Sequence, residues 1–121
     1  SQLVHSSRGN TITVDAYNAN PTSMQAAINA FNGDTFILGA MRELGDYSHL
    51  EHQNIVNMLA ERKAPTVLLV GEEYAKTTSP YLVFPNVDAL CSYLQEHSVS
   101  GATILLKGSR SNQMEKALPL L

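Results

Sequence analysis

Three short polar segments carry residue types from which a binding site could be built. The first is Asp15-Ala-Tyr-Asn-Ala-Asn20, the second covers residues 39–46, and the third is Lys107-Gly-Ser-Arg-Ser111. Each follows an apolar run, at a point where a strand would give way to a helix. The third segment combines a glycine, two hydroxyls and two cations just before an expected helix, whose free backbone N–H groups and dipole would favour an anion. Arg110 could bind a carboxylate through two parallel hydrogen bonds.

Ordinary structural roles account for parts of the same segments. Asn and Asp before a helix usually cap it or form a turn. Gly39 and Gly45 could have no role beyond turning the chain. Arg42 and Glu43 could form a solvated ion pair that contributes little to stability. Each segment taken alone is therefore ambiguous, and the interpretation depends on whether the fold brings the three together.

Other reactive residue types do not form a recognisable site. His49 and His52 are three residues apart on an expected helix, but no third ligand is evident, so we expect a solvated or capping role and no metal site. Cys91 is the single cysteine and falls in an apolar helical pattern, which predicts a small buried hydrophobe. The sequence has no G-x-x-x-x-G-K-[ST] loop, so it carries no phosphate-binding loop of its own.

Strand and helix patterns alternate along the chain. We expect strands at 3–6, 11–14, 35–38, 66–70, 81–84 and 102–106, and helices at 21–31, 48–62, 87–96 and 111–118. Asn20 and Asn86 are suitable caps, and Ser48 with Glu51 has the spacing of a capping box. The strand at 81–84 is expected in the core, and the last helix begins at the third polar segment.

These elements predict one α/β domain over residues 1–121. Several strands are short and apolar without alternation, which is typical of strands covered by helices on both faces. The predicted fold is Rossmann-like and doubly wound, with a mostly parallel sheet and an antiparallel N-terminal edge hairpin. Ligands of such folds gather at the carboxyl ends of the strands, which is where the three polar segments are expected to meet.

Composition excludes several functional classes. The chain has 121 residues, with 8 Lys and Arg against 11 Asp and Glu, and a net charge of −3, which does not suggest a nucleic-acid binder. No apolar run approaches the ~20 residues that a membrane span needs. A single cysteine favours a reducing compartment, and we expect the cytoplasm. The chain opens on Ser1 and is strand-like from the start, so we expect a piece of a longer protein.

Three motifs together resemble the C-terminal domain of the Mur ligases. They are DAYNANPTSM at 15–24, LGAMRELGDYSHLEH at 38–52 and LLKGSRSNQMEKAL at 105–118, and the similarity covers essentially the whole chain. The first motif is similar to that of the whole ligase superfamily. The second and third are similar to those of the members that add D-alanyl-D-alanine.

The resemblance implies a three-domain enzyme of peptidoglycan synthesis. In that family a central domain holds ATP and Mg²⁺, and an N-terminal domain holds the UDP sugar. ATP phosphorylates a carboxylate of UDP-N-acetylmuramoyl-tripeptide, and the amine of D-Ala-D-Ala attacks the acyl phosphate. The C-terminal domain closes over both and brings the dipeptide. We therefore expect no ligase activity from this chain alone.

The resemblance also assigns roles to single residues, none of them catalytic. Asp15 and Asn18 would contact ATP, with Asp15 facing the ribose, and Tyr17 and Asn20 would line the closing face beside them. The residues implied for the D-Ala-D-Ala site are Arg42, Glu43, Leu44, Gly45, Lys107, Ser109, Arg110 and Ser111.

Three departures from the family pattern accompany the resemblance. Ala40 stands where the family usually has Asp, so a carboxylate role is in doubt there. The counterpart of the nucleotide-contacting linker Arg would lie upstream of Ser1, because Arg8 falls in the hairpin turn. The connection Asn32-Gly33-Asp34 is short, which indicates a lost loop.

Two alternatives stay open. The domain could belong to a sister enzyme, either another Mur ligase or a folylpolyglutamate synthase. It could also be a stand-alone α/β module that binds a small carboxylate or a protein partner, because fold alone does not decide function.

Overall fold

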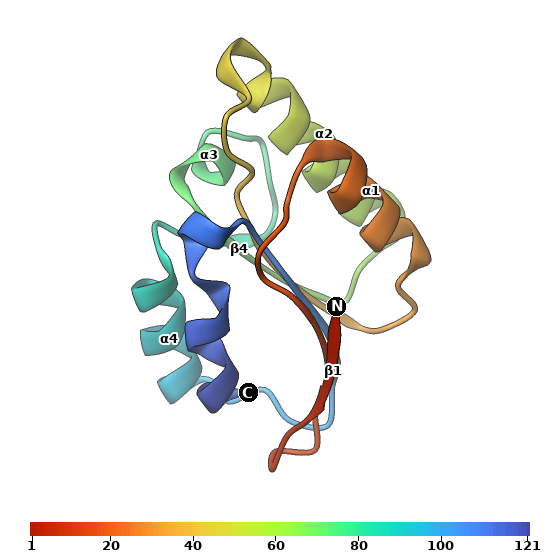
Figure 1. The fold of residues 1–121 in the computed structure, drawn as a ribbon, viewed down its shortest axis with the longest axis vertical. Helices are drawn as coiled ribbons and strands as arrows, with labels where there is room; N and C mark the ends of the chain where they lie inside the picture. Colours follow the sequence, from red (N-terminus) through yellow and green to blue (C-terminus); the bar gives the residue numbers. More distant parts are fainter.

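A single six-stranded sheet forms the centre of the protein. The computed structural model describes residues 1–121, and Figure 1 shows its fold. The strand order is β1-β2-β6-β3-β4-β5; β1 pairs antiparallel with β2, and the other neighbouring strands are parallel. The strands are β1 (Gln2–His5), β2 (Thr11–Asp15), β3 (Thr35–Gly39), β4 (Thr66–Val70), β5 (Leu82–Phe84) and β6 (Thr103–Lys107). The predicted Rossmann-like α/β fold with an antiparallel edge hairpin is confirmed.

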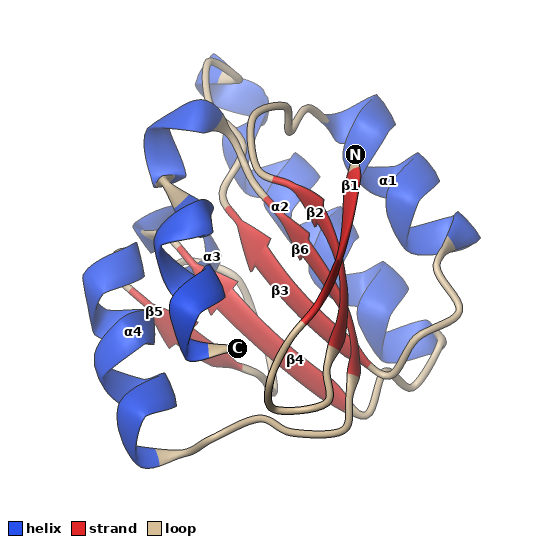
Figure 2. Cartoon of the chain, turned by 60° about the horizontal axis from the view of Figure 1, so that its bottom comes forward, coloured by secondary structure: helices blue, strands red, loops and turns tan.

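Helices cover both faces of this sheet, as Figure 2 shows. The helices α1 and α2 lie on one face, and α4 with the C-terminal 3₁₀ segment η3 lies on the other. The bounds are α1 (Pro21–Ala30), α2 (Ser48–Glu61), α3 (Glu72–Ala75), α4 (Val87–Glu96), η1 (Gly45–Tyr47), η2 (Arg110–Asn112) and η3 (Met114–Leu120). No helix is long and apolar enough to span a membrane.

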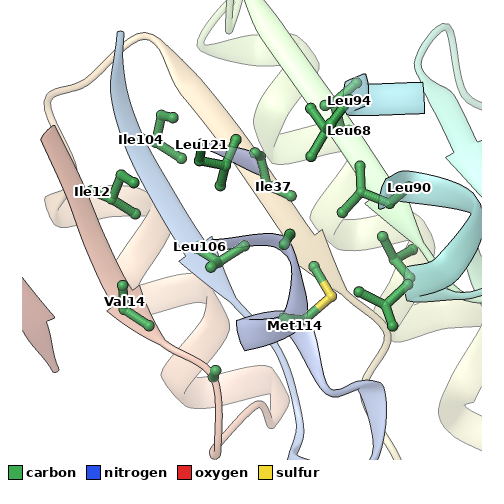
Figure 3. Close-up of a cluster of buried hydrophobic side chains, with 14 of the residues drawn as sticks. Ile12, Val14, Ile37, Leu68, Leu90, Leu94, Ile104, Leu106, Met114 and Leu121 are labelled. Carbon is green, nitrogen blue, oxygen red and sulfur yellow. The ribbon is translucent and has the colours of Figure 1, made fainter. Parts of the chain in front are cut away.

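The core consists of two layers separated by the sheet. On β6, Ile104 and Leu106 pack with α4 and η3, whereas Leu105 between them packs with α1 and α2. Figure 3 shows the first layer, in which Leu90 and Met114 meet side chains of the strands. Because both faces are buried, successive strand residues are apolar, which explains the lack of alternation in the sequence. Each fully buried aliphatic side chain contributes ~1.5–3 kcal/mol to stability.

The predicted caps of α1 and α4 are confirmed. Asn20 Oδ1 accepts a hydrogen bond from Ser23 N at 2.9 Å, and Ser23 Oγ accepts one from Asn20 N at 3.1 Å, so α1 begins with a reciprocal box. Asn86 Oδ1 accepts from Ala89 N at 2.9 Å. These bonds satisfy backbone donors that have no partner within the helix. Both helices that follow β2 and β5 therefore start at fixed points next to the carboxyl edge of the sheet.

The prediction of a capping box at the start of α2 is wrong. The 3₁₀ turn η1 leads directly into α2, so the capping position falls on Tyr47, which makes no side-chain cap. Ser48 is already helical and lies beside His52 instead, and Glu51 Oε1 accepts from Asn54 Nδ2 at 3.3 Å. The continuous turn removes the free N–H groups that a box would satisfy.

Two further predictions about elements need correction. The strand predicted at 81–84 is a short edge strand, β5, rather than a core strand, and Leu82 is 51% exposed. The predicted last helix is two 3₁₀ segments, η2 and η3, which meet at Gln113 in the left-handed region (φ 55°). No α-helix N-terminus therefore follows the third polar segment. The short helix α3 was not predicted at all.

Candidate functional site

The carboxyl edge of the sheet brings the three polar segments together, as predicted. Asp15 at the end of β2 is in register with Lys107 at the end of β6, and Leu38 of β3 is in register with the same lysine. Parallel strands place their carboxyl ends on one edge, so adjacency in the sheet becomes adjacency of the segments that follow. Side-chain contacts between the segments then complete the site.

Lys107 joins the first segment to the third from beneath the surface. Its side chain is 1% exposed, and its Nζ donates to Asp15 Oδ2 at 2.6 Å and to the Asn18 carbonyl at 2.7 Å. A buried ammonium loses its hydration, and these two acceptors compensate for that loss. Lys107 therefore fixes the segment 15–18 and presents no charge to solvent. The side chain of Asp15 remains 34% exposed.

Arg42 joins the second segment to the third. Its Nε donates to Ser111 Oγ at 3.0 Å, and its Nη1 donates to the carboxylate of Glu73 on α3. The side chain of Arg42 is still 41% exposed, so part of the guanidinium faces solvent. The alternative of an Arg42–Glu43 ion pair is wrong. Glu43 is exposed, with its backbone in the left-handed region (φ 62°), and the acidic partner of Arg42 is Glu73 on α3.

Glu73 is a site residue that the sequence interpretation missed. Burial raises the pKa of its carboxyl, but the hydrogen bond from its own backbone N–H and the pairing with Arg42 outweigh this effect, and the pKa lies below the usual value. The carboxylate is therefore charged. The available signal was its position, because Gly71, Glu72 and Glu73 directly follow β4 at the same edge of the sheet.

Hydrogen bonds among its own residues fix the backbone of the third segment. The buried Asn112 accepts at Oδ1 from Ser109 N at 2.7 Å and from Ser109 Oγ at 2.8 Å, and the Ser109 and Ser111 hydroxyls lie 2.9 Å apart. Gly39 leaves room for this amide, because a Cβ on Gly39 would lie 2.4 Å from Asn112 Oδ1. The prediction of free N–H groups for an anion is therefore wrong at Ser109, whose N–H is already used.

Side chains of the first and third segments form part of the exposed surface of the site. Arg110 and Ser111 are exposed, and the Arg110 guanidinium lies 5.8 Å from the centre of the exposed Tyr17 ring. Asn20 serves as the cap of α1. The segment after Arg42 turns at Gly45 (φ 56°), where η1 begins.

Two hollows flank Arg42 at this edge. The first has a volume of about 190 Å³ and is lined by residues that include Arg42, Gly71, Asn86, Ser111 and Lys116. The second is an open hollow of about 470 Å³, lined by Arg42, Glu72, Glu73, Lys76 and Pro85. Cationic and anionic side chains line both hollows, and the Ser111 hydroxyl lines the first, so the site suits a small polar molecule that carries a carboxylate.

The structure also places three other residues that the sequence analysis singled out, which are His52, Cys91 and Ala40. The expectation that His52 is solvated or a cap is wrong, because its side chain is fully buried. Cys91 is half-buried against the core, and burial raises the pKa of its thiol. Ala40 is fully buried, and a Cβ on Gly71 would lie 2.6 Å from the Ala40 Cβ, so the side chain at position 40 contributes packing in this chain.

Fold and site together define an α/β domain with a polar binding edge at the carboxyl ends of its parallel strands. Residues 1–110 of the sequence match the protein-family model described as the Mur ligase, glutamate ligase domain. The chain belongs to the Mur ligase family.

Two relatives of the chain share the name of one member of the family. The chain is 30% identical over 125 residues to the UDP-N-acetylmuramoyl-tripeptide–D-alanyl-D-alanine ligase of Treponema pallidum, covering 92% of this chain and 27% of the relative. It is 29% identical over 130 residues to the enzyme of the same name from Bacillus subtilis, covering 95% and 28%. The chain thus spans just over a quarter of the length of these relatives.

Solved structures agree in fold. The crystal structure of MurF ligase from Thermotoga maritima in complex with ADP matches with a TM-score of 0.78 at 27% identity, covering 98% of this chain and 29% of that one. MurF from Acinetobacter baumannii matches with a TM-score of 0.70 at 28% identity, with the same coverage.

Proposed function

We propose that this chain is the C-terminal domain, residues 1–121, of a three-domain ligase that uses ATP to join D-Ala-D-Ala to UDP-N-acetylmuramoyl-tripeptide in the cytoplasm. The observation that carries the proposal is the Arg42–Ser111 contact, which joins the two segments that resemble the D-alanyl-D-alanine-adding members. The names of the relatives and the ADP complex of a similar structure support it.

The proposed dipeptide site is centred on Arg42. A dipeptide carries a carboxylate at one end and an ammonium at the other. Arg42 and the Ser111 hydroxyl bonded to it supply donors for the carboxylate, and the exposed Arg110 precedes Ser111 in the same segment. Glu73 supplies the opposite charge. The turn from Glu43 through Leu44 to Gly45 bounds the site, and Lys107 and Ser109 hold its floor rather than contact the ligand. This changes the role of Lys107 from that implied by the resemblance.

The proposed nucleotide contacts lie on the first segment. Lys107 Nζ donates a hydrogen bond to Asp15 Oδ2, so the other oxygen of the Asp15 carboxylate is available to accept one from a ribose hydroxyl. The side chain of Asn18, three residues further along the same segment, is exposed. Tyr17 and Asn20 are exposed on the same loop and form the proposed closing face. No group of three or more His, Cys, Asp or Glu side chains in this chain could by itself hold a metal ion. We assign Mg²⁺ and the phosphates of ATP to another domain.

The proposed contribution of this domain to the reaction is placement. A dipeptide seated by its carboxylate presents its amine to the activated carboxyl group of the tripeptide. Orientation of this kind can lower a barrier by ~7–11 kcal/mol at most. Closure of the domain also excludes water, which would otherwise hydrolyse the acyl phosphate.

The experiment that tests this proposal is steady-state kinetics of the full-length protein that contains this chain. We expect Arg42→Ala to raise the KM for D-Ala-D-Ala by about tenfold or more, which corresponds to the loss of a charged hydrogen bond. Arg8→Ala is the matched control, because Arg8 lies in the hairpin turn at the opposite end of β2. Faster use of D-Glu, diaminopimelate or L-Glu than of D-Ala-D-Ala would favour a sister ligase instead.

A further inference from the structure

A buried histidine contacts the backbone directly before Arg42. His52 is fully buried on α2, its Nε2 lies 3.0 Å from Met41 N, and its Nδ1 lies 2.6 Å from the Ser48 carbonyl oxygen. An amide N–H can only donate and a carbonyl oxygen can only accept. The ring must therefore be neutral, with its proton on Nδ1 and the lone pair of Nε2 directed at Met41.

Each residue from Gly39, at the end of β3, to Met41 has a backbone group held by a hydrogen bond. The Gly39 carbonyl accepts from the Tyr74 hydroxyl at 3.3 Å, Ala40 N donates to the Val70 carbonyl at 2.8 Å, and Met41 N donates to His52. Ala40 and Met41 are buried, so water does not compete for these bonds. The backbone that leads into Arg42 is thereby fixed by three separate elements.

Packing alone does not require a histidine at this position. His52 lies on the apolar stripe that Ile55, Val56 and Leu59 form on α2, where a leucine would bury more apolar surface. Burying a polar ring has a cost in free energy that only its hydrogen bonds offset. Those bonds go to Ser48 on the same helix and to Met41, and only the second reaches the site.

We infer that His52 is a positioning residue for the carboxylate-binding group, because it fixes the Met41 backbone so that Arg42 reaches both Ser111 and Glu73. The inference rests on the proposed function, in which Arg42 binds the dipeptide. It adds a residue to which the resemblance assigned no role and which is absent from the exposed surface of the site, because His52 is fully buried.

Protonation of His52 would disturb this arrangement. An imidazolium carries a proton on Nε2, which would face the Met41 N–H. The charged and titratable groups around the ring are Glu73 and Tyr74 of α3, Glu51 of α2 and Arg42 itself. Burial lowers the pKa of His52 more than the Ser48 carbonyl and Glu73 raise it. The neutral, positioning form is therefore favoured down to below the usual histidine pKa.

Two substitutions separate positioning from packing in the full-length protein. In His52→Gln the side-chain oxygen can reach the place of Nε2 and accept from Met41, whereas the shorter side chain of His52→Asn cannot. We expect H52N to raise the KM for D-Ala-D-Ala by about tenfold with the KM for ATP unchanged, and H52Q to stay within about threefold of the wild type. In the R42A background, H52N is expected to add little, because its effect acts through Arg42.

Hydrogen exchange measured by mass spectrometry gives a second readout that does not depend on turnover. The Met41 amide is expected to exchange faster in H52N than in H52Q. If R42A raises the KM but H52N and H52Q both match the wild type in KM and in exchange, the inference is overturned and the proposed function stands. If R42A itself leaves the KM for D-Ala-D-Ala unchanged, the proposed function is wrong, and the inference that rests on it falls with it.

Discussion

Arg42 and Ser111 are separated by 69 positions in the chain, yet the Nε of one lies 3.0 Å from the Oγ of the other. The contact exists because β3 and β6 are parallel neighbours, so the segments that leave their carboxyl ends meet. Arg42 is also paired with Glu73, which follows β4. One guanidinium thus connects the segments that follow three adjacent strands, and its geometry depends on all of them.

The Arg42–Glu73 pair is predicted to contribute little to stability. Both side chains are partly exposed, so water screens the attraction. We expect a double-mutant cycle of Arg42→Ala and Glu73→Ala, measured by urea denaturation, to give a coupling free energy of unfolding of ~0–1 kcal/mol. A coupling well above this range would show that the pair is a structural element rather than part of a binding surface.

The Lys107–Asp15 pair is predicted to respond differently to the loss of each partner. Asp15→Asn leaves the ammonium of Lys107 buried with a weaker set of acceptors, and we expect a loss of ~3–5 kcal/mol in the free energy of unfolding. Lys107→Met leaves a carboxylate that is one-third exposed and can be hydrated, so the loss is expected to be smaller. Urea denaturation of both variants measures the difference, and equal losses would contradict this account.

The close approach of Gly39 and Asn112 is predicted to hold the third segment against the second. In Gly39→Ala the new methyl group would meet Asn112 Oδ1, and overpacking of this kind costs ~1–3 kcal/mol. The matched control is Gly101→Ala, because the space around Gly101 is open and any cost there comes from its backbone (φ 64°) alone. Thermal unfolding compares the two, and the KM for D-Ala-D-Ala is expected to rise only in Gly39→Ala, because only Gly39 lies at the site.

Much of the fold follows from patterns within short windows of sequence. The apolar runs and the Asn20 and Asn86 caps depend on neighbours within a few residues, and the elements they define were predicted nearly to the residue. Parallel pairing places the polar segments at one edge of the sheet, as the sequence analysis predicts, and the strand order makes them neighbours there. Here the local signals and the tertiary structure agree.

Other features depend on contacts that no short window contains. Glu73 becomes the partner of Arg42 only because β4 lies beside β3, and Lys107 is buried only because Asp15 and Asn18 cover it. The role of His52 had a visible signal, since it lies on the same helical stripe as Ile55 and Leu59 and is therefore expected to face the core. A polar residue on such a stripe indicates a buried hydrogen bond.

The stability of the protein is predicted to fall in mild acid because of His52. Burial holds the pKa of the imidazole below its unfolded value, so between these two values the unfolded state binds more protons than the folded state. The free energy of unfolding therefore increases with pH in this window, and the contribution is complete above the ordinary value of 6.5. As the pH falls from 6.5 through the lower folded-state pKa, this part of the stability is lost.

His52→Gln removes the titrating group while it keeps an acceptor for Met41. The difference in the free energy of unfolding between wild type and H52Q is therefore expected to shift in favour of the variant as the pH is lowered below 6.5, and to be constant above it. His97→Gln is the control, because His97 is exposed at the end of α4. Urea denaturation across this range provides the measurement. Parallel curves for wild type and H52Q would show that the buried ring does not titrate with folding, and the acid sensitivity would then have to come from other groups.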